Sequence, residues 1–109
     1  MNPKKTPAKV SDTDIRYVIQ LSHARAELFS ETLVRAHVAH LKRLESNGQL
    51  ELAGPFTDAA GGMLILRVSS EDQARMIAEA DPFVSSGAES YELRRWELSH
   101  RGNNHQGMG

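Results

Sequence analysis

Apolar and polar residues change their spacing along the chain, and each change predicts a new element. Residues 15–21 alternate, with apolar side chains at every second position, which is typical of a β-strand. From residue 31 to residue 46 the apolar positions follow the period of a helix, and one stripe holds Leu33, Val34, Val38, Leu41 and Leu44. Ser30 is suited to begin this helix, and Asn47-Gly48 is suited to end it.

The next segments predict two strands joined by a turn. Leu50, Leu52 and Ala53 predict a short strand that Gly54-Pro55 interrupts, because proline cannot donate a hydrogen bond to a sheet. Residues 57–62 predict the turn. The nearly continuous apolar run from residue 62 to residue 68 predicts a strand that is covered on both faces.

A second helix and a last strand complete the pattern. Ser69 or Ser70 begins the helix, and Asp81-Pro82 ends it, because the residue before proline avoids the helical conformation. Its inward positions are Ala74, Ile77 and Ala78. Residues 83–87 predict a connector, and residues 89–98 predict a strand with Tyr91, Leu93 and Arg95 on one face and Glu92, Arg94 and Trp96 on the other.

This order predicts an α+β fold of the ferredoxin-like βαββαβ type. Right-handed crossovers would give a four-stranded antiparallel sheet with both helices on one face. The other face of the sheet would be bare, and a chain of 109 residues buries only about two-thirds of its unfolded surface. We therefore expect a homodimer that covers this face, in a dimeric α/β barrel-type assembly.

The length predicts a single domain between two tails. Residues 15–98 form the domain, and residues 1–14 and 99–109 predict disordered tails because they lack apolar periodicity. Thirteen basic and fourteen acidic residues give a net charge of −1, which argues against nucleic acid and membrane surfaces as partners. The chain has no cysteine, which excludes disulfides and thiolate chemistry, and it has no long apolar segment. We expect a cytoplasmic protein.

Two histidines three residues apart are the main candidates for chemistry. His37 falls inside the apolar stripe of the first helix, and His40 falls at its edge. A histidine in such a place usually packs and makes one hydrogen bond. A catalytic role needs a carboxylate that tunes the imidazole. Asp81 and Asp58 are the candidates, although a helix-breaking turn explains the first and a solvated turn explains the second.

The same histidines raise the question of a metal. His37 and His40 share a helical face and, with one carboxylate, have the ligand types that bind a divalent cation. Nothing marks a third firm ligand, so we predict no metal and no cofactor. The other three histidines, His23, His100 and His105, are expected in solvent.

Several short motifs together resemble the YCII-related (YciI-like) family. They are His40-Leu41 with Leu44, the Gly48 helix stop, Ala53-Gly54-Pro55-Phe56, Gly61-Gly62, and Ala80-Asp81-Pro82-Phe83-Val84 followed by Gly87. The resemblance runs from about residue 15 to residue 96. It implies a dimeric ferredoxin-like domain with a presumed active site, in which the family's histidine corresponds to His40 and its aspartate to Asp81.

These observations lead to three hypotheses of function. The first is an enzyme in which His40, held by Asp81, moves a proton on a small molecule in a lyase, isomerase or dehydrochlorinase-like reaction. Its substrate would contact His37, Pro55, Phe56 and Phe83. The second is a non-catalytic ligand-binding or interaction module that uses the same pocket. The third is a metal-dependent, oxygenase-like dimer.

Overall fold

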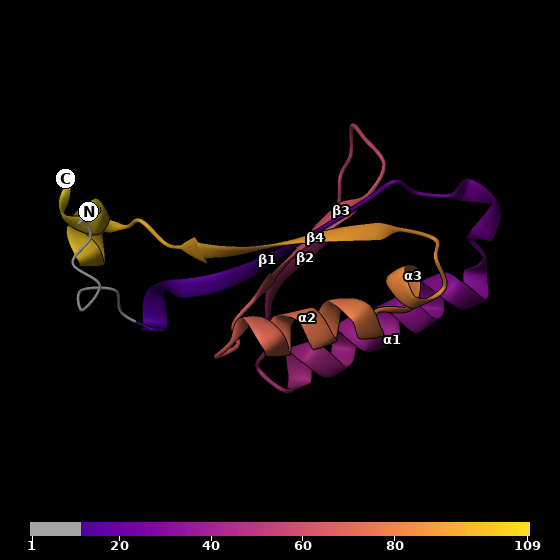
Figure 1. The fold of residues 1–109 in the computed structure, drawn as a ribbon, viewed down its shortest axis with the longest axis horizontal. Coiled ribbons are helices and arrows are strands. Elements are labelled where there is room, and N and C mark those ends of the chain that lie inside the picture. The colour runs from indigo at the N-terminus through magenta and orange to yellow at the C-terminus, as the bar shows by residue number, and fades with distance from the viewer. Residues whose placement is uncertain (1–11) are drawn as a thin grey trace.

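The computed structural model describes residues 12–109, which form one four-stranded antiparallel sheet with helices on one face (Figure 1). The strands lie in the order β2-β3-β1-β4. They are β1 (Ile15–Ser22), β2 (Leu50–Pro55), β3 (Gly62–Leu66) and β4 (Ser90–Glu97), and the helices on the sheet are α1 (Glu31–Ser46), α2 (Glu71–Ala80) and the short α3 (Pro82–Ser85). The predicted ferredoxin-like α+β fold is confirmed.

Both long helices begin at a serine, as predicted. The side chain of Ser30 accepts a hydrogen bond from the Leu33 amide at 3.0 Å, and that of Ser70 accepts one from the Gln73 amide at 3.1 Å. Each bond satisfies an amide that has no partner inside its helix. The acidic residues that follow stabilise the positive end of the helix dipole.

The hydrophobic core lies between the sheet and the two long helices. The alternate residues of β1 that face the helices are all buried. The core cluster contains Ile15, Tyr17, Ile19, Leu21, Leu44, Leu64, Leu66, Ala74 and Ala78. The two alanines are at most 1% exposed, and their small side chains let α2 approach the sheet closely.

Two local predictions differ from the structure. β2 continues through Gly54 to Pro55 instead of stopping before them. It is an edge strand, and a proline whose nitrogen faces away from the neighbouring strand breaks no ladder bond there. The predicted connector after Asp81 contains the four-residue helix α3, which the local sequence Asp-Pro favours because both residues suit a helix start.

The C-terminal segment, residues 99–109, is predicted from sequence as a disordered tail; the structure has a 3-10 turn at Arg101–Asn103 and the short turn labelled α4 (Asn104–Gly107), whose residues have positive φ. The side chain of His100 bonds to the Asp14 carboxylate at 2.7 Å, which ties this segment to the start of β1. Such side-chain bonds leave no periodic signal in the sequence. Residues 1–11 of the predicted N-terminal tail lie outside the described residues. Among residues 12–109, no helix has the length and apolarity that a membrane crossing requires.

Candidate functional site

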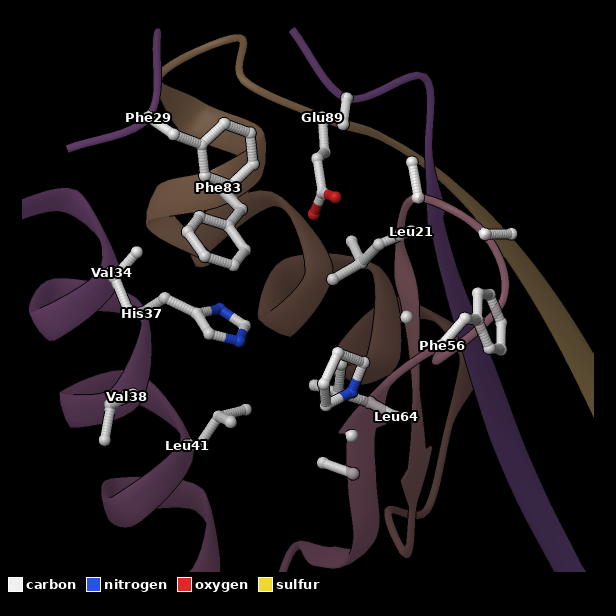
Figure 2. A pocket seen from close by; sticks show the side chains of 18 residues that line it. Leu21, Phe29, Val34, His37, Val38, Leu41, Phe56, Leu64, Phe83 and Glu89 are labelled. Atoms are coloured by element: carbon white, nitrogen blue, oxygen red, sulfur yellow. The ribbon is translucent and has the colours of Figure 1, made fainter. Parts of the chain in front are cut away.

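A pocket of about 520 Å³ opens between α1, the hairpin of β2 and β3, and the segment that leads into β4 (Figure 2). Eighteen residues line it, and only His37 and Glu89 among them have polar side chains. Phe29, Phe56 and Phe83 supply aromatic walls. Such a lining, apolar with a few polar groups, is typical of a site for a small organic ligand.

Both sides of the pocket follow from the sequence. On α1, Val34 and Val38 belong to the apolar stripe but remain 41% and 39% exposed, because they face the pocket rather than the core. On the hairpin, Gly61 has a φ of +94°, and a side chain there would meet the backbone oxygen of Leu21. A side chain at Gly62 would likewise meet the Gly54 oxygen. The two glycines therefore let the hairpin lie directly against its neighbours.

Asp81 stands at the junction between α2 and α3. It precedes proline and is extended, with φ −64° and ψ 125°, so α2 ends there. Its Oδ1 accepts a hydrogen bond from the Phe83 amide at 2.9 Å, which begins α3. The side chain is almost fully buried, so the carboxylate is held in one orientation.

The same oxygen, Asp81 Oδ1, lies 2.8 Å from Nδ1 of His37. The His37 side chain is 13% exposed, and its ring stacks on Phe83 with centroids 3.9 Å apart and planes within 10°. Because Oδ1 already accepts a backbone amide, the carboxylate is the acceptor and Nδ1 carries the proton. The other ring nitrogen, Nε2, makes no hydrogen bond within residues 12–109 and is free to accept a proton from the pocket.

His40 lies one turn further along α1 and has different surroundings. It is 5% exposed and does not line the pocket. Burial lowers the pKa of His40 below its ordinary 6.5, although the charge of Asp81 and a hydrogen bond with the backbone of Ile77 raise it. His40 Nε2 and Asp81 Oδ2 are both buried without a hydrogen-bond partner in the described chain. His40 is therefore buried near α2 and outside the lining of the pocket, and its predicted catalytic role stays a prediction.

Glu89 is the second polar group of the pocket. It precedes β4, is 7% exposed, and directs its carboxyl group into the hollow (Figure 2). Burial raises the pKa of Glu89 above its ordinary 4.5; His37 opposes this shift, and Asp81 adds to it. Sequence reasoning missed Glu89, because a glutamate before an amphipathic strand carries no signal of burial. Phe29, which contacts Phe83 at a centroid distance of 5.0 Å, was missed because a single aromatic residue in a loop carries no periodic signal.

Comparisons with known proteins agree on the family. The sequence model of the YCII-related domain matches residues 15–97. The chain belongs to the YCII-related family. A relative, "Uncharacterized protein YjpA" of Bacillus subtilis (strain 168), is 34% identical over 82 residues, which is 75% of this chain and 96% of that protein. The family resemblance inferred from the short motifs is thus confirmed.

A solved structure resembles this YCII-related chain in fold. It is the 5-chloro-2-hydroxyhydroquinone dehydrochlorinase (TftG) from Burkholderia phenoliruptrix AC1100, in complex with 2,5-dihydroxybenzoquinone. The TM-score is 0.60 at 23% identity, over 82% of this chain and 99% of that chain. At this level of identity the similarity supports the fold.

The structure of this YCII-related domain brings together most of the predicted site residues. The four predicted substrate-binding residues, His37, Pro55, Phe56 and Phe83, all line the pocket. Asp81 lies behind His37 and bonds to it, whereas the predicted bond is to His40. Both histidines point toward the same side of α1, so the sequence places both near Asp81 without showing which one bonds to it.

The remaining candidates lie elsewhere. Asp58 is exposed and is not among the residues that line the pocket. His23 is exposed, with its ring 3.1 Å from the hydroxyl of Ser22, and His105 is exposed near Ser99. Over residues 12–109, no group of three histidine, aspartate or glutamate side chains is placed to hold a metal ion.

Proposed function

We propose that this YCII-related domain is an enzyme that moves a proton on a small, mostly apolar organic molecule. The base would be Nε2 of His37, and Asp81 would orient it. One observation carries the proposal: a histidine in an apolar pocket is bonded through its other nitrogen to a buried carboxylate. The sequence alone favoured His40 for this role, and we assign it to His37 because His37 lines the pocket.

Each part of the pair has a physical purpose. The bond to Asp81 fixes the tautomer in which Nδ1 carries the proton, so that Nε2 presents its lone pair to the pocket. When Nε2 accepts a proton, the nearby carboxylate stabilises the imidazolium ion. Stacking on Phe83 limits rotation of the ring. A positioned base of this kind contributes roughly 10²–10⁴-fold to a rate.

Eliminations and isomerisations suit such a pair, because they need proton transfer without a nucleophile. The TftG structure is named a dehydrochlorinase and holds a small cyclic dihydroxyquinone, and loss of hydrogen chloride is one such elimination. A ring of that size also suits the volume and the aromatic walls of the pocket described above. We therefore propose a small cyclic molecule bearing hydroxyl or carbonyl groups as substrate.

A panel of three probes tests the proposal. Chloride release is followed with 5-chloro-2-hydroxyhydroquinone, and exchange of C–H protons for deuterium is followed by NMR with cyclohexanone and with γ-butyrolactone. We expect the wild-type chain to accelerate at least one reaction and His37→Gln to lose about 10²-fold or more. His23→Gln is the matched control, because this histidine is exposed outside the pocket.

The panel also separates the alternatives. If His37→Gln retains full activity and His40→Gln loses it, the base is His40 and our assignment is wrong. If 2,5-dihydroxybenzoquinone binds, as seen by shifts of pocket resonances, while no probe reacts, the domain is a ligand-binding module. The apolar lining that favours binding is common to both functions.

We also propose that the domain forms a homodimer through the face of the sheet opposite the helices. Leu52, Met63 and Trp96 are on that face and are 65%, 38% and 47% exposed. Exposed large apolar side chains on one sheet face favour contact with a second copy. Scattering at several concentrations should give twice the mass of one chain, and Leu52→Glu should shift it toward the monomer. A cytoplasmic location stays a prediction.

A further inference from the structure

Glu89 reaches the pocket from an element different from the one that carries His37. Its backbone amide donates a hydrogen bond to the Phe83 carbonyl at 2.8 Å, so the turn after α3 fixes where its side chain begins. Figure 2 shows the carboxyl group entering the hollow from the segment before β4, while the His37 ring enters from α1. A ligand in the pocket would therefore meet two titratable groups that come from different elements.

The surroundings of Glu89 offer it little compensation for burial. Its carboxyl group makes no side-chain hydrogen bond within residues 12–109, and apart from His37 the side chains that line the pocket with it are apolar. The titratable groups that shift the pKa of Glu89 are His37, which lowers it, and Asp81, which raises it. The backbone of Arg25 contacts neighbouring Ala88, but the Arg25 guanidinium is exposed and bonds to Glu27.

Glu89 is 7% exposed, and its carboxyl oxygens open onto the pocket without a side-chain hydrogen bond in residues 12–109. Partial desolvation disfavours the charged form of such a group, a penalty that an apolar side chain would not carry. Titratable groups that are retained in a pocket at the expense of stability are candidates for function. A carboxylic acid that shares an apolar pocket with a histidine can donate a proton to a ligand while the histidine removes one from it.

We propose that Glu89, in its protonated form, is the proton donor of the pocket and that the substrate carries a carbonyl oxygen that accepts its proton. This inference deepens the proposed function and rests on it. The acid and the base would then act together on one carbonyl compound.

The proposed step is balanced within the substrate and the two residues. His37 Nε2 takes the proton from the carbon next to the carbonyl. The C–H electron pair forms the carbon–carbon double bond of an enol, and the carbonyl oxygen takes the proton of Glu89. Return of a proton to a different carbon gives an isomer, while departure of chloride as an anion gives an elimination. Proton exchange with water restores both side chains.

The protonation state of Glu89 is tested first, because this needs no substrate. Side-chain carboxyl resonances of the full chain are titrated by carbon-13 NMR, with exposed Glu45 on α1 as the internal reference. We expect the midpoint of Glu89 to lie above that of Glu45, because burial favours the neutral acid. It should rise further in His37→Gln, because His37 opposes the upward shift of the Glu89 pKa. A Glu89 midpoint equal to that of Glu45 would overturn the inference.

Exchange of the α-protons of cyclohexanone for deuterium then tests the role in catalysis. Glu89→Gln keeps a hydrogen-bond donor in the pocket but has no proton to transfer, and we expect it to lower the rate by about 10²-fold. Glu45→Gln is the control and should match the wild-type chain. A Glu89→Gln variant with the rate and pH profile of the wild type would overturn the proton-donor role.

The two proposals fail in different ways. If His37→Gln loses activity and Glu89→Gln does not, the proposed function survives and the inference about Glu89 is wrong. If neither substitution changes the rate, or if the wild-type chain does not accelerate exchange over buffer, both the proton-donor role of Glu89 and the carbonyl substrate are wrong. In that case chloride release from 5-chloro-2-hydroxyhydroquinone still decides whether His37 is a base.

Discussion

The two ends of the layer between helices and sheet are built differently. At one end, Leu66, Ala74 and Ala78 are at most 1% exposed and pack closely between the sheet and α2. At the other end, the same helix stripe faces a pocket of about 520 Å³. The two histidines of α1 differ in the same way, because His40 is buried outside the pocket and His37 lines it. Identical side chains thus acquire different chemistry from their surroundings.

Truncation at the packed end should have the largest effect on stability. We expect Leu66→Ala to lower the free energy of unfolding by about 2–5 kcal/mol, because it leaves a cavity among buried neighbours. Val38→Ala, at the pocket end, should cost less than about 1 kcal/mol, because Val38 is already 39% exposed. Urea unfolding of both variants measures the difference. Equal losses would mean that the pocket end is as tightly packed as the core.

Asp81 links the two ends, and its loss should have the next largest effect. Asp81→Ala removes the bond to His37 and the bond to the Phe83 amide. We expect it to lower the free energy of unfolding by about 1–3 kcal/mol. Asp81→Asn keeps an oxygen that can accept either bond and should cost less. Thermal unfolding measures both variants. Equal costs would show that the charge, and not the hydrogen bonds, stabilises this junction.

The buried His40 should make stability depend on pH. Since the folded state lowers the pKa of His40 below 6.5, its neutral form is fully favourable above that pH, and stability is lost as the pH falls from 6.5 through the folded-state pKa. His40→Leu should remove this part of the acid dependence. Urea unfolding at pH 7.5 and at several lower values measures it. Parallel curves for the two proteins would contradict the prediction.

The smallest effect is expected at the start of α1, close to the pocket. Ser30→Ala removes the hydrogen bond to the Leu33 amide and should cost about 1 kcal/mol. Thr32→Ala is the control, since Thr32 is exposed within the first turn of the same helix. Guanidinium unfolding of the two variants gives the comparison, and a cost no larger than that of Thr32→Ala would mean that this bond does not stabilise the helix.

The sequence predicted the elements well because their signals are local. The stripe of α1, the serine at the start of each long helix and the alternation of β1 all follow from neighbouring residues. Pro55 misled the prediction because its effect depends on whether β2 is an edge strand, which only the sheet order reveals. The bond from His100 to Asp14, far along the chain, leaves no local signal in the segment after residue 98.

The site was predictable only in part, for a related reason. Periodicity placed both His37 and His40 on the side of α1 that faces the rest of the domain. Which of the two meets Asp81 depends on where α3 begins relative to α1, and this is a matter of tertiary packing. Glu89 gave no signal, since its burial comes from the turn after α3 and not from any local pattern.

One atom, Oδ1 of Asp81, both begins α3 and holds the ring of His37. The ring also rests on Phe83, which belongs to that same four-residue helix. Two contacts thus join the imidazole to α3, and the position of this short helix sets the orientation of the ring. The side chain of Phe83 lines the pocket, so the same short helix shapes the pocket wall and orients the imidazole.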